Sequence, residues 1–402
     1  MKATFIAGLG LVLASGFLAW NYAPVQKYRE KESQQFTTSA PSAPSVRPAA
    51  ATAKDNTRIQ VALLLDTSNS MDGLIDQAKS RLWNIINTLT TLKYQGKTPV
   101  IEIALYEYGN DGLSPRENFI RQVVPLTTDL DLISEKLFAL RTNGGEEFCG
   151  AVIKSAVNAL EWGHNEADMK LIYIAGNEPF NQGRVNYATA VGEAVDKQIY
   201  VNTIFCGNKR EGITTKWKEG ADRGRGKYFN IDSDRKVDFI ETPYDNQIEA
   251  YNTKVNDTYI GYGSYGMAKK QNQVLQDANA KSVSKANSVE RYVSKSKTVY
   301  KNESWDLVDL SKQDPAVLKK ISKNQLPKEL QDKTEAEIRK IVEEKSKERE
   351  TIQKEMAVLA KKRQQYIDDV IRRGPKGADD LGTAISQSIV EFAATKGYTA
   401  EK

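Results

Sequence analysis

The strongest constraint on the fold is a regular alternation of apolar runs and helical patterns between residues 58 and 245. The run "IQVALLL" at 59–65 is typical of a strand buried on both faces, and the apolar residues after it recur at helical spacing. This alternation predicts an α/β fold with an open, mostly parallel, doubly wound sheet and helices on both faces. The expected strands lie at 59–65, 99–109, 119–126, 170–176, 199–207 and 227–232.

The C-terminal part of the chain, residues 246–402, changes to polar, helix-prone sequence with few strand signals. Residues 334–373 contain no Gly or Pro and carry apolar residues at a seven-residue spacing, which predicts one long amphipathic helix. Lys345 and Arg349 interrupt its apolar stripe. Two arrangements stay open: packing against residues 244–297 of the same chain, or a coiled coil with another protein.

Two different signals precede the α/β region. The chain has no charge from Ala3 to Trp20, a length between that of a signal-peptide core and that of a membrane span. Because no clear A-x-A cleavage site follows, we expect residues 1–23 to be a membrane anchor, with the rest of the chain in the periplasm or outside the cell. Secretion after signal cleavage is the alternative. Residues 24–57 are rich in Ser, Ala and Pro and predict a disordered linker.

Composition argues against several classes of function. The 57 Lys and Arg residues and the 52 Asp and Glu residues are interspersed, so we expect no nucleic-acid partner. His164 is the only histidine, which excludes His-rich zinc sites and leaves a Ser-His-Asp mechanism dependent on one residue. The sequence also lacks a Gly-flanked nucleophile elbow around its "DTSNS" motif at 66–70, so we expect no enzymatic activity. It does not indicate an oligomeric state.

The apolar strand at 59–65 runs directly into a group of oxygen-bearing side chains, Asp66, Ser68 and Ser70. Sites in open parallel sheets form where strands end at their carboxyl edge. Hard cations such as Mg²⁺ prefer oxygen ligands, and an ion held by few carboxylates attracts an anion from outside. The alternative is that the two serines cap the following helix while Asp66 accepts backbone N–H groups.

The "DTSNS" motif after an apolar strand resembles the von Willebrand factor type A (vWA) domain, whose metal-ion-dependent adhesion site (MIDAS) has the signature D-x-S-x-S. The resemblance covers residues 58–242, within an expected domain at 58–245, and is closest to bacterial exported or membrane-anchored members. In the family, a second loop contributes a Thr and a third an Asp. Here Glu147 stands at the Thr position and Gly176 at the Asp position, followed by Asn177 and Glu178.

The resemblance therefore implies a site for Mg²⁺, or for Mn²⁺ or Ca²⁺, with ligands from all three loops. It also implies protein binding, in which an Asp or Glu carboxylate of the partner completes the coordination. We predict an extracytoplasmic, membrane-tethered protein-binding module. A metal-independent scaffold that binds partners through its C-terminal helices is the alternative. The candidate ligands are Asp66, Ser68, Ser70, Glu147 and Asn177.

The two cysteines, Cys149 and Cys206, are expected near the same edge of the sheet. Sequence spacing does not establish the approach of about 5.5 Å between Cα atoms that a disulfide needs. A disulfide and two buried thiols therefore both stay open.

Overall fold

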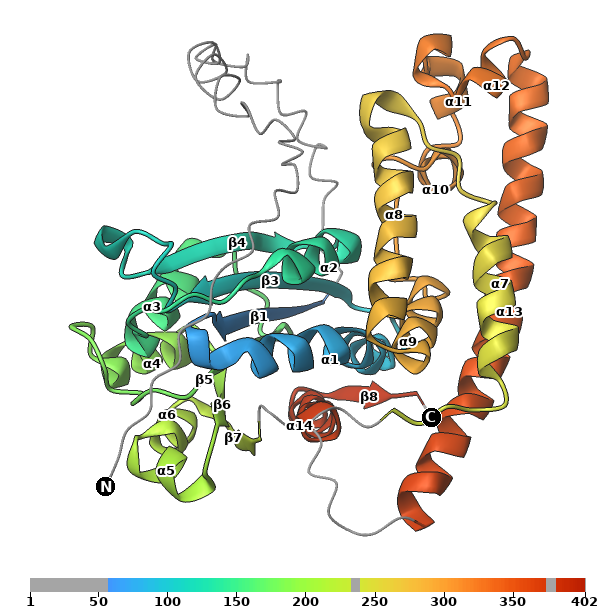
Figure 1. The fold of residues 1–402 in the computed structure, drawn as a ribbon. Coiled ribbons are helices and arrows are strands. Elements are labelled where there is room, and N and C mark those ends of the chain that lie inside the picture. Colours follow the sequence, from blue (N-terminus) through green and yellow to red (C-terminus); the bar gives the residue numbers. More distant parts are fainter. Residues whose placement is uncertain (1–56, 233–238, 374–380, 402) are drawn as a thin grey trace, which may run out of the picture. The chain divides into compact units, whose positions relative to one another are not determined.

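The computed structural model describes residues 57–232, 239–373 and 381–401, and its centre is a six-stranded sheet (Figure 1). The strand order is β4-β3-β1-β5-β6-β7; β4 is antiparallel to β3, and all the other pairs are parallel. The predicted open, mostly parallel α/β sheet is confirmed. Its strands are β1 (Arg58–Asp66), β3 (Val100–Tyr108), β4 (Ile120–Thr127), β5 (Met169–Gly176), β6 (Ile199–Cys206) and β7 (Arg225–Ile231).

Helices pack on both faces of this sheet. Val61 and Leu63 of β1 lie in one core with α1 (Asp72–Thr90) and α2 (Leu130–Ala139), whereas Ala62 and Leu64 lie in a second core on the opposite face. Because successive strand residues point to opposite faces, burial on both sides explains why β1 is apolar throughout. The second core is covered by α3 (Cys149–Ala159), α4 (Tyr187–Asp196) and α6 (Trp217–Arg223), and α5 (Lys209–Thr214) packs beside α6.

The last helix of the chain, α14 (Leu381–Thr395), packs on the same face as α1. The hydroxyl of Tyr173 on β5 lies 3.0 Å from Oγ of Ser388, and the rings of Tyr200 and Phe392 lie 5.0 Å apart. The chain then forms β8 (Tyr398–Ala400), which pairs antiparallel with β2 (Leu92–Tyr94) just after α1. This short strand pair has no counterpart among the expected strands.

The long helix α13 (Glu335–Arg373) packs within its own chain, along α7 (Asp245–Asn256) and α10 (Leu307–Gln313). Arg349, expected to interrupt its apolar stripe, is buried and donates to Asp306. The remaining helices are α8 (Gly263–Val283), α9 (Lys285–Lys295), α11 (Val317–Lys320) and α12 (Lys328–Gln331), and the 3₁₀ turns are η2 (Asn69–Met71), η3 (Pro115–Glu117) and η4 (Lys323–Gln325).

One prediction concerning the cell membrane needs correction. Within residues 57–232, 239–373 and 381–401, the structure has no helix with the length and apolar character needed to cross a bilayer. The longest, α13, carries charged residues along its whole length. The predicted location, a cell membrane with a single N-terminal span, is therefore wrong by this finding. The expected anchor at 1–23 and all but the last residue of the expected linker at 24–57 lie outside the described residues.

Candidate metal site at the carboxyl edge of the sheet

The sheet brings the three loops of the predicted site to one edge. Strand β1 lies between β3 and β5, with Asp66 in register with Tyr108 and Leu65 in register with Ala175. The chain segments that follow these three parallel strands therefore leave the sheet side by side at its carboxyl edge. We call this group of loops the edge site.

Asp66 is the most deeply buried member of the edge site. Its Oδ1 accepts a hydrogen bond of 2.8 Å from the backbone N–H of Ser68, whereas its Oδ2 is buried and has no hydrogen-bond partner within the described residues. The pKa of Asp66 is raised to about 8, mainly by burial and also by the negative charges of Glu147 and Glu178, whereas hydrogen bonds from Ser68 lower it. Without a nearby cation, this carboxyl group therefore favours its protonated form at neutral pH.

The two serines and Asn177 lie together next to this carboxylate. The Oγ atoms of Ser68 and Ser70 are 3.2 Å apart, and Nδ2 of Asn177 donates to Oγ of Ser70 at 3.0 Å. Oδ1 of Asn177 is buried without a hydrogen-bond partner among the described residues. Neither η2 nor α1 receives a side-chain cap hydrogen bond, so helix capping does not account for the serine hydroxyls.

Two glycines allow the second loop to approach Asp66. Gly109 has φ +77°, and a Cβ there would lie 2.7 Å from Cγ of Glu147 and 2.9 Å from Oδ1 of Asp66. A Cβ at Gly145 would clash with the carbonyl oxygen of Gly109. Since no other residue type leaves this space empty, the backbone approach depends on glycine at both positions.

Glu147 is therefore held inside the edge site and is buried. Burial raises its pKa, a hydrogen bond from the Ser68 hydroxyl lowers it, and the charge of Glu178 raises it. The structure thus places a second carboxyl group beside Asp66 and Ser68, at the position where the vWA family has Thr. The carboxyl group of Glu178 lies close enough to affect both pKa values.

The third loop differs from the family pattern because a tyrosine fills the space where an aspartate would lie. A Cβ at Gly176 would be 2.5 Å from Oη of Tyr108 and 3.0 Å from Oδ2 of Asp66. Tyr108 donates a hydrogen bond of 2.9 Å to the carbonyl oxygen of Ala175, which holds its hydroxyl there. Tyr108 is absent from the residues predicted for the site, although it lies within the expected strand at 99–109 and ends β3.

Both cysteines are free thiols and are buried. Of the two alternatives left open by the sequence, the structure therefore has two buried thiols and not a disulfide. Sγ of Cys149 lies 3.8 Å from Oη of Tyr108. Burial raises the pKa of both thiols well above its usual range. They are therefore protonated at neutral pH and unsuited to binding a metal ion as thiolates.

The donor set of the edge site fits a hard divalent cation. Within the part of the chain that the structure describes, no three His, Cys, Asp or Glu residues form a group that could hold a metal ion. The edge site instead combines carboxylate, hydroxyl and amide oxygens, the ligand types that Mg²⁺ accepts alongside retained water. The two buried oxygens without partners, on Asp66 and Asn177, are the atoms that such an ion would satisfy.

Comparison with known proteins finds structural similarity only. No protein-family model matches the chain, and no curated protein matches it. A similar solved structure is an aerotolerance-related membrane protein from Bacteroides fragilis, with 17% identity, a TM-score of 0.30, and coverage of 43% of this chain and 92% of that one.

Two further solved structures are similar over a comparable share of the chain. The SpRpn10 VWA domain has 14% identity and a TM-score of 0.32, with coverage of 43% of this chain and 87% of that one. Proximal thread matrix protein 1 from the mussel byssus, solved with a zinc-occupied MIDAS motif, has 13% identity and a TM-score of 0.34. The match covers 45% of this chain and 43% of that one. The names of two of these neighbours include a VWA domain and a MIDAS motif.

Proposed function

We propose that this protein is a protein-binding module that engages its partner through a divalent cation held in the edge site. The observation that supports this most directly is the pair of buried oxygens without hydrogen-bond partners, Oδ2 of Asp66 and Oδ1 of Asn177, beside the hydroxyls of Ser68 and Ser70. An unpaired buried oxygen is costly unless an ion, a proton or water satisfies it. Mg²⁺ is the expected ion, with Mn²⁺ or Ca²⁺ as alternatives of the same chemistry.

The ligands would come from all three loops, with Asp66 and Glu147 supplying carboxylates and Ser68, Ser70 and Asn177 supplying neutral oxygens. Ser70 is exposed, whereas Asp66 and Glu147 are buried, so the edge site extends from the interior of the domain to its surface. A bound ion supplies positive charge at that surface, and an Asp or Glu carboxylate is the partner group that complements it. A partner can approach from the side of Ser70.

Thermal unfolding of the full chain with and without millimolar Mg²⁺ or Mn²⁺ tests the ion site. We expect the ion to raise the melting temperature, since a ligand at 100 times its Kd stabilises the folded state by about 2.7 kcal/mol. Asp66→Asn and Glu147→Gln should remove most of this shift. Glu146→Gln is the matched control, because the neighbouring Glu146 is exposed. The absence of a shift in the wild-type protein would overturn the ion site.

The partner is tested by affinity capture in Mg²⁺ and in EDTA, with the wild-type protein and with the Ser68→Ala/Ser70→Ala double variant. A partner of the edge site should be lost in EDTA and with the double variant. It should also be lost when one of its own Asp or Glu residues is changed to the corresponding amide. Partners that persist under all these conditions would instead support the metal-independent scaffold.

A further inference from the structure

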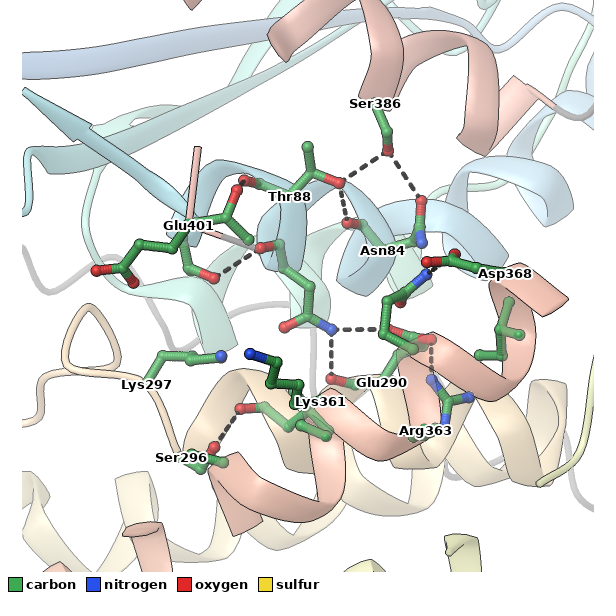
Figure 2. A pocket seen from close by; sticks show the side chains of 18 of the residues that line it. Asn84, Thr88, Glu290, Ser296, Lys297, Lys361, Arg363, Asp368, Ser386 and Glu401 are labelled. Atoms are coloured by element: carbon green, nitrogen blue, oxygen red, sulfur yellow. Dashed lines mark hydrogen bonds and ion pairs between the residues drawn. The ribbon is translucent and has the colours of Figure 1, made fainter. Parts of the chain in front are cut away.

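A second candidate site lies away from the edge site, in a groove between α1, α9 and α13 that has residues of α14 on its wall and is lined by both polar and apolar side chains (Figure 2). The groove encloses about 1100 Å³, far more than a single ion requires. None of Asp66, Ser68, Ser70, Glu147 and Asn177 lines it. A ligand in the groove would therefore contact none of the residues proposed to hold the ion.

One part of this groove has its polar groups paired with one another. Arg363 forms ion pairs with Glu290 and with Asp245, the latter at 3.1 Å. Nδ2 of Asn87 donates to the Glu290 carboxylate at 2.7 Å, and Oγ1 of Thr88 donates to Oγ of Ser386 at 2.8 Å. Because these groups already satisfy each other, this part offers no unpaired charge to a ligand.

The other part has an excess of positive charge. The side chains of Lys297 and Lys361 point toward each other across the groove (Figure 2), and neither ammonium group forms an ion pair or a hydrogen bond within the described residues. Lys93 also lines this part, and its Nζ lies 3.7 Å from a carboxylate oxygen of Glu401. The Glu401 side chain is 66% exposed, so it neutralises this group of lysines only weakly.

We propose that Lys297 and Lys361 bind an oxyanion, either a carboxylate group of an acidic peptide or a phosphate group. An oxyanion between the two ammonium groups would accept charge-assisted hydrogen bonds from both. The pKa of Lys297 is lowered mainly by burial; the charge of Glu401 raises it and the charge of Lys93 lowers it. An anion bound between the lysines would add to the effect of Glu401 and stabilise this cation. Amide, hydroxyl and apolar side chains along the groove, including Asn84, Thr88 and Ile367, leave room for the rest of the ligand.

Titration calorimetry on the full chain at constant ionic strength tests this proposal. The probes are inorganic phosphate and a blocked triglutamate peptide, which separate the two sources of the anion. We expect saturable binding of at least one probe by the wild-type protein. Lys297→Gln and Lys361→Gln should each weaken that binding about tenfold, the value of one charge-assisted hydrogen bond. Lys362→Gln is the matched control, because the adjacent Lys362 is exposed and does not line the groove.

Two further variants distinguish anion binding in the groove from ion binding at the edge site and from nonspecific charge attraction. Glu401→Gln should tighten binding several-fold, because it removes the carboxylate that competes for the lysines. Asp66→Asn should leave anion binding unchanged, so a failed ion site does not affect this test. Lys361 is exposed, and its substitution therefore remains informative if Lys297→Gln does not fold. The proposal would be overturned if neither probe bound saturably, or if Lys361→Gln and Lys362→Gln had equal effects.

Discussion

Nη1 of Arg291 on α9 lies 2.7 Å from Oδ1 of Asp131 on α2, across 160 positions of sequence. Nε of Arg291 lies 2.6 Å from Oδ1 of Asp277, and its guanidinium group lies over the Trp83 ring at 4.7 Å. Lys295 pairs with the same Asp277 at 2.9 Å. This cluster of four buried charges joins the C-terminal helices to the helices that cover the sheet.

We expect Arg291→Met to lower the free energy of unfolding by about 3–5 kcal/mol, because it leaves the buried Asp131 carboxylate without a partner cation. Arg339→Met is the control: Arg339 pairs with Glu335 on the surface of α13, and surface pairs contribute about 0–1 kcal/mol. Urea unfolding of both variants measures the difference. If the two substitutions lowered the free energy of unfolding by similar amounts, the buried cluster would contribute no more to stability than a surface ion pair.

The same cluster predicts a pH dependence through Lys295. Burial lowers the pKa of Lys295 from 10.5 to about 8, so between these values the folded protein binds fewer protons at this site than the unfolded chain. Stability contributed by this group therefore rises as the pH increases from about 8 to 10.5, and it is constant below that range.

Urea unfolding between pH 7 and pH 10 checks this sign. The difference in unfolding free energy between the wild-type protein and Lys295→Met should increase with pH above about 8. Lys281→Met is a control, because Glu249 raises the pKa of Lys281. The difference in unfolding free energy between the wild-type protein and Lys281→Met should therefore not increase with pH. A flat profile for Lys295→Met would show that burial does not lower its pKa.

The architecture of the sheet follows from the sequence because each of its strands carries a local signal. The β1 run is apolar at successive positions, and Asp129 caps α2 by accepting a hydrogen bond of 2.9 Å from the Leu132 N–H. The arrangement of α13 has no such signal. Arg349 interrupts its apolar stripe, yet it is buried between Asp306 and the Tyr259 ring, which lies 3.9 Å from its guanidinium carbon. Contacts between residues so distant in the sequence, such as those of Arg349 with Asp306 and Tyr259, produce no periodic pattern in the sequence.

In the edge site too, contacts between residues far apart in the sequence are not predictable from sequence patterns. The "DTSNS" motif indicates where Asp66, Ser68 and Ser70 lie, because their positions depend on one strand and its loop. The hydroxyl of Tyr108, in contrast, occupies the space beside Gly176 through packing across β3, β1 and β5. Such packing depends on strand order and register, which the spacing of residues along one chain segment does not specify.

The position of α14 predicts different costs for two adjacent residues. Ile389 is fully buried in the core shared with α1, whereas Val390 is 38% exposed. Ile389→Ala should lower the free energy of unfolding by about 2–5 kcal/mol, as for other large buried aliphatic residues. Val390→Ala should lower the free energy of unfolding by well below half of the loss expected for Ile389→Ala. Chemical denaturation measures both, and equal costs would show that α14 does not complete the core in solution.

The approach of Glu147 to Asp66 is tested by two glycines with the same backbone conformation. Gly109 and Gly96 both have φ +77°, so an alanine at either position costs about 1 kcal/mol in backbone conformation. A Cβ at Gly96 would meet no atom within 4 Å, whereas one at Gly109 would lie 2.7 Å from Cγ of Glu147. Gly109→Ala therefore has to displace Glu147 from the edge site, and Gly96→Ala does not.

We expect both variants to be destabilised, Gly109→Ala by the larger amount. The decisive measurement is the rise in melting temperature on adding Mg²⁺, which should be intact in Gly96→Ala and reduced or lost in Gly109→Ala. Because the backbone cost is common to both, a difference in this shift reports on the positions of the Glu147 and Asp66 side chains, both of which a Cβ at Gly109 would contact, rather than on general stability. If both variants kept the full Mg²⁺ shift, the ion would not depend on the Glu147 carboxylate, and the ligand set would shrink to Asp66, Ser68, Ser70 and Asn177.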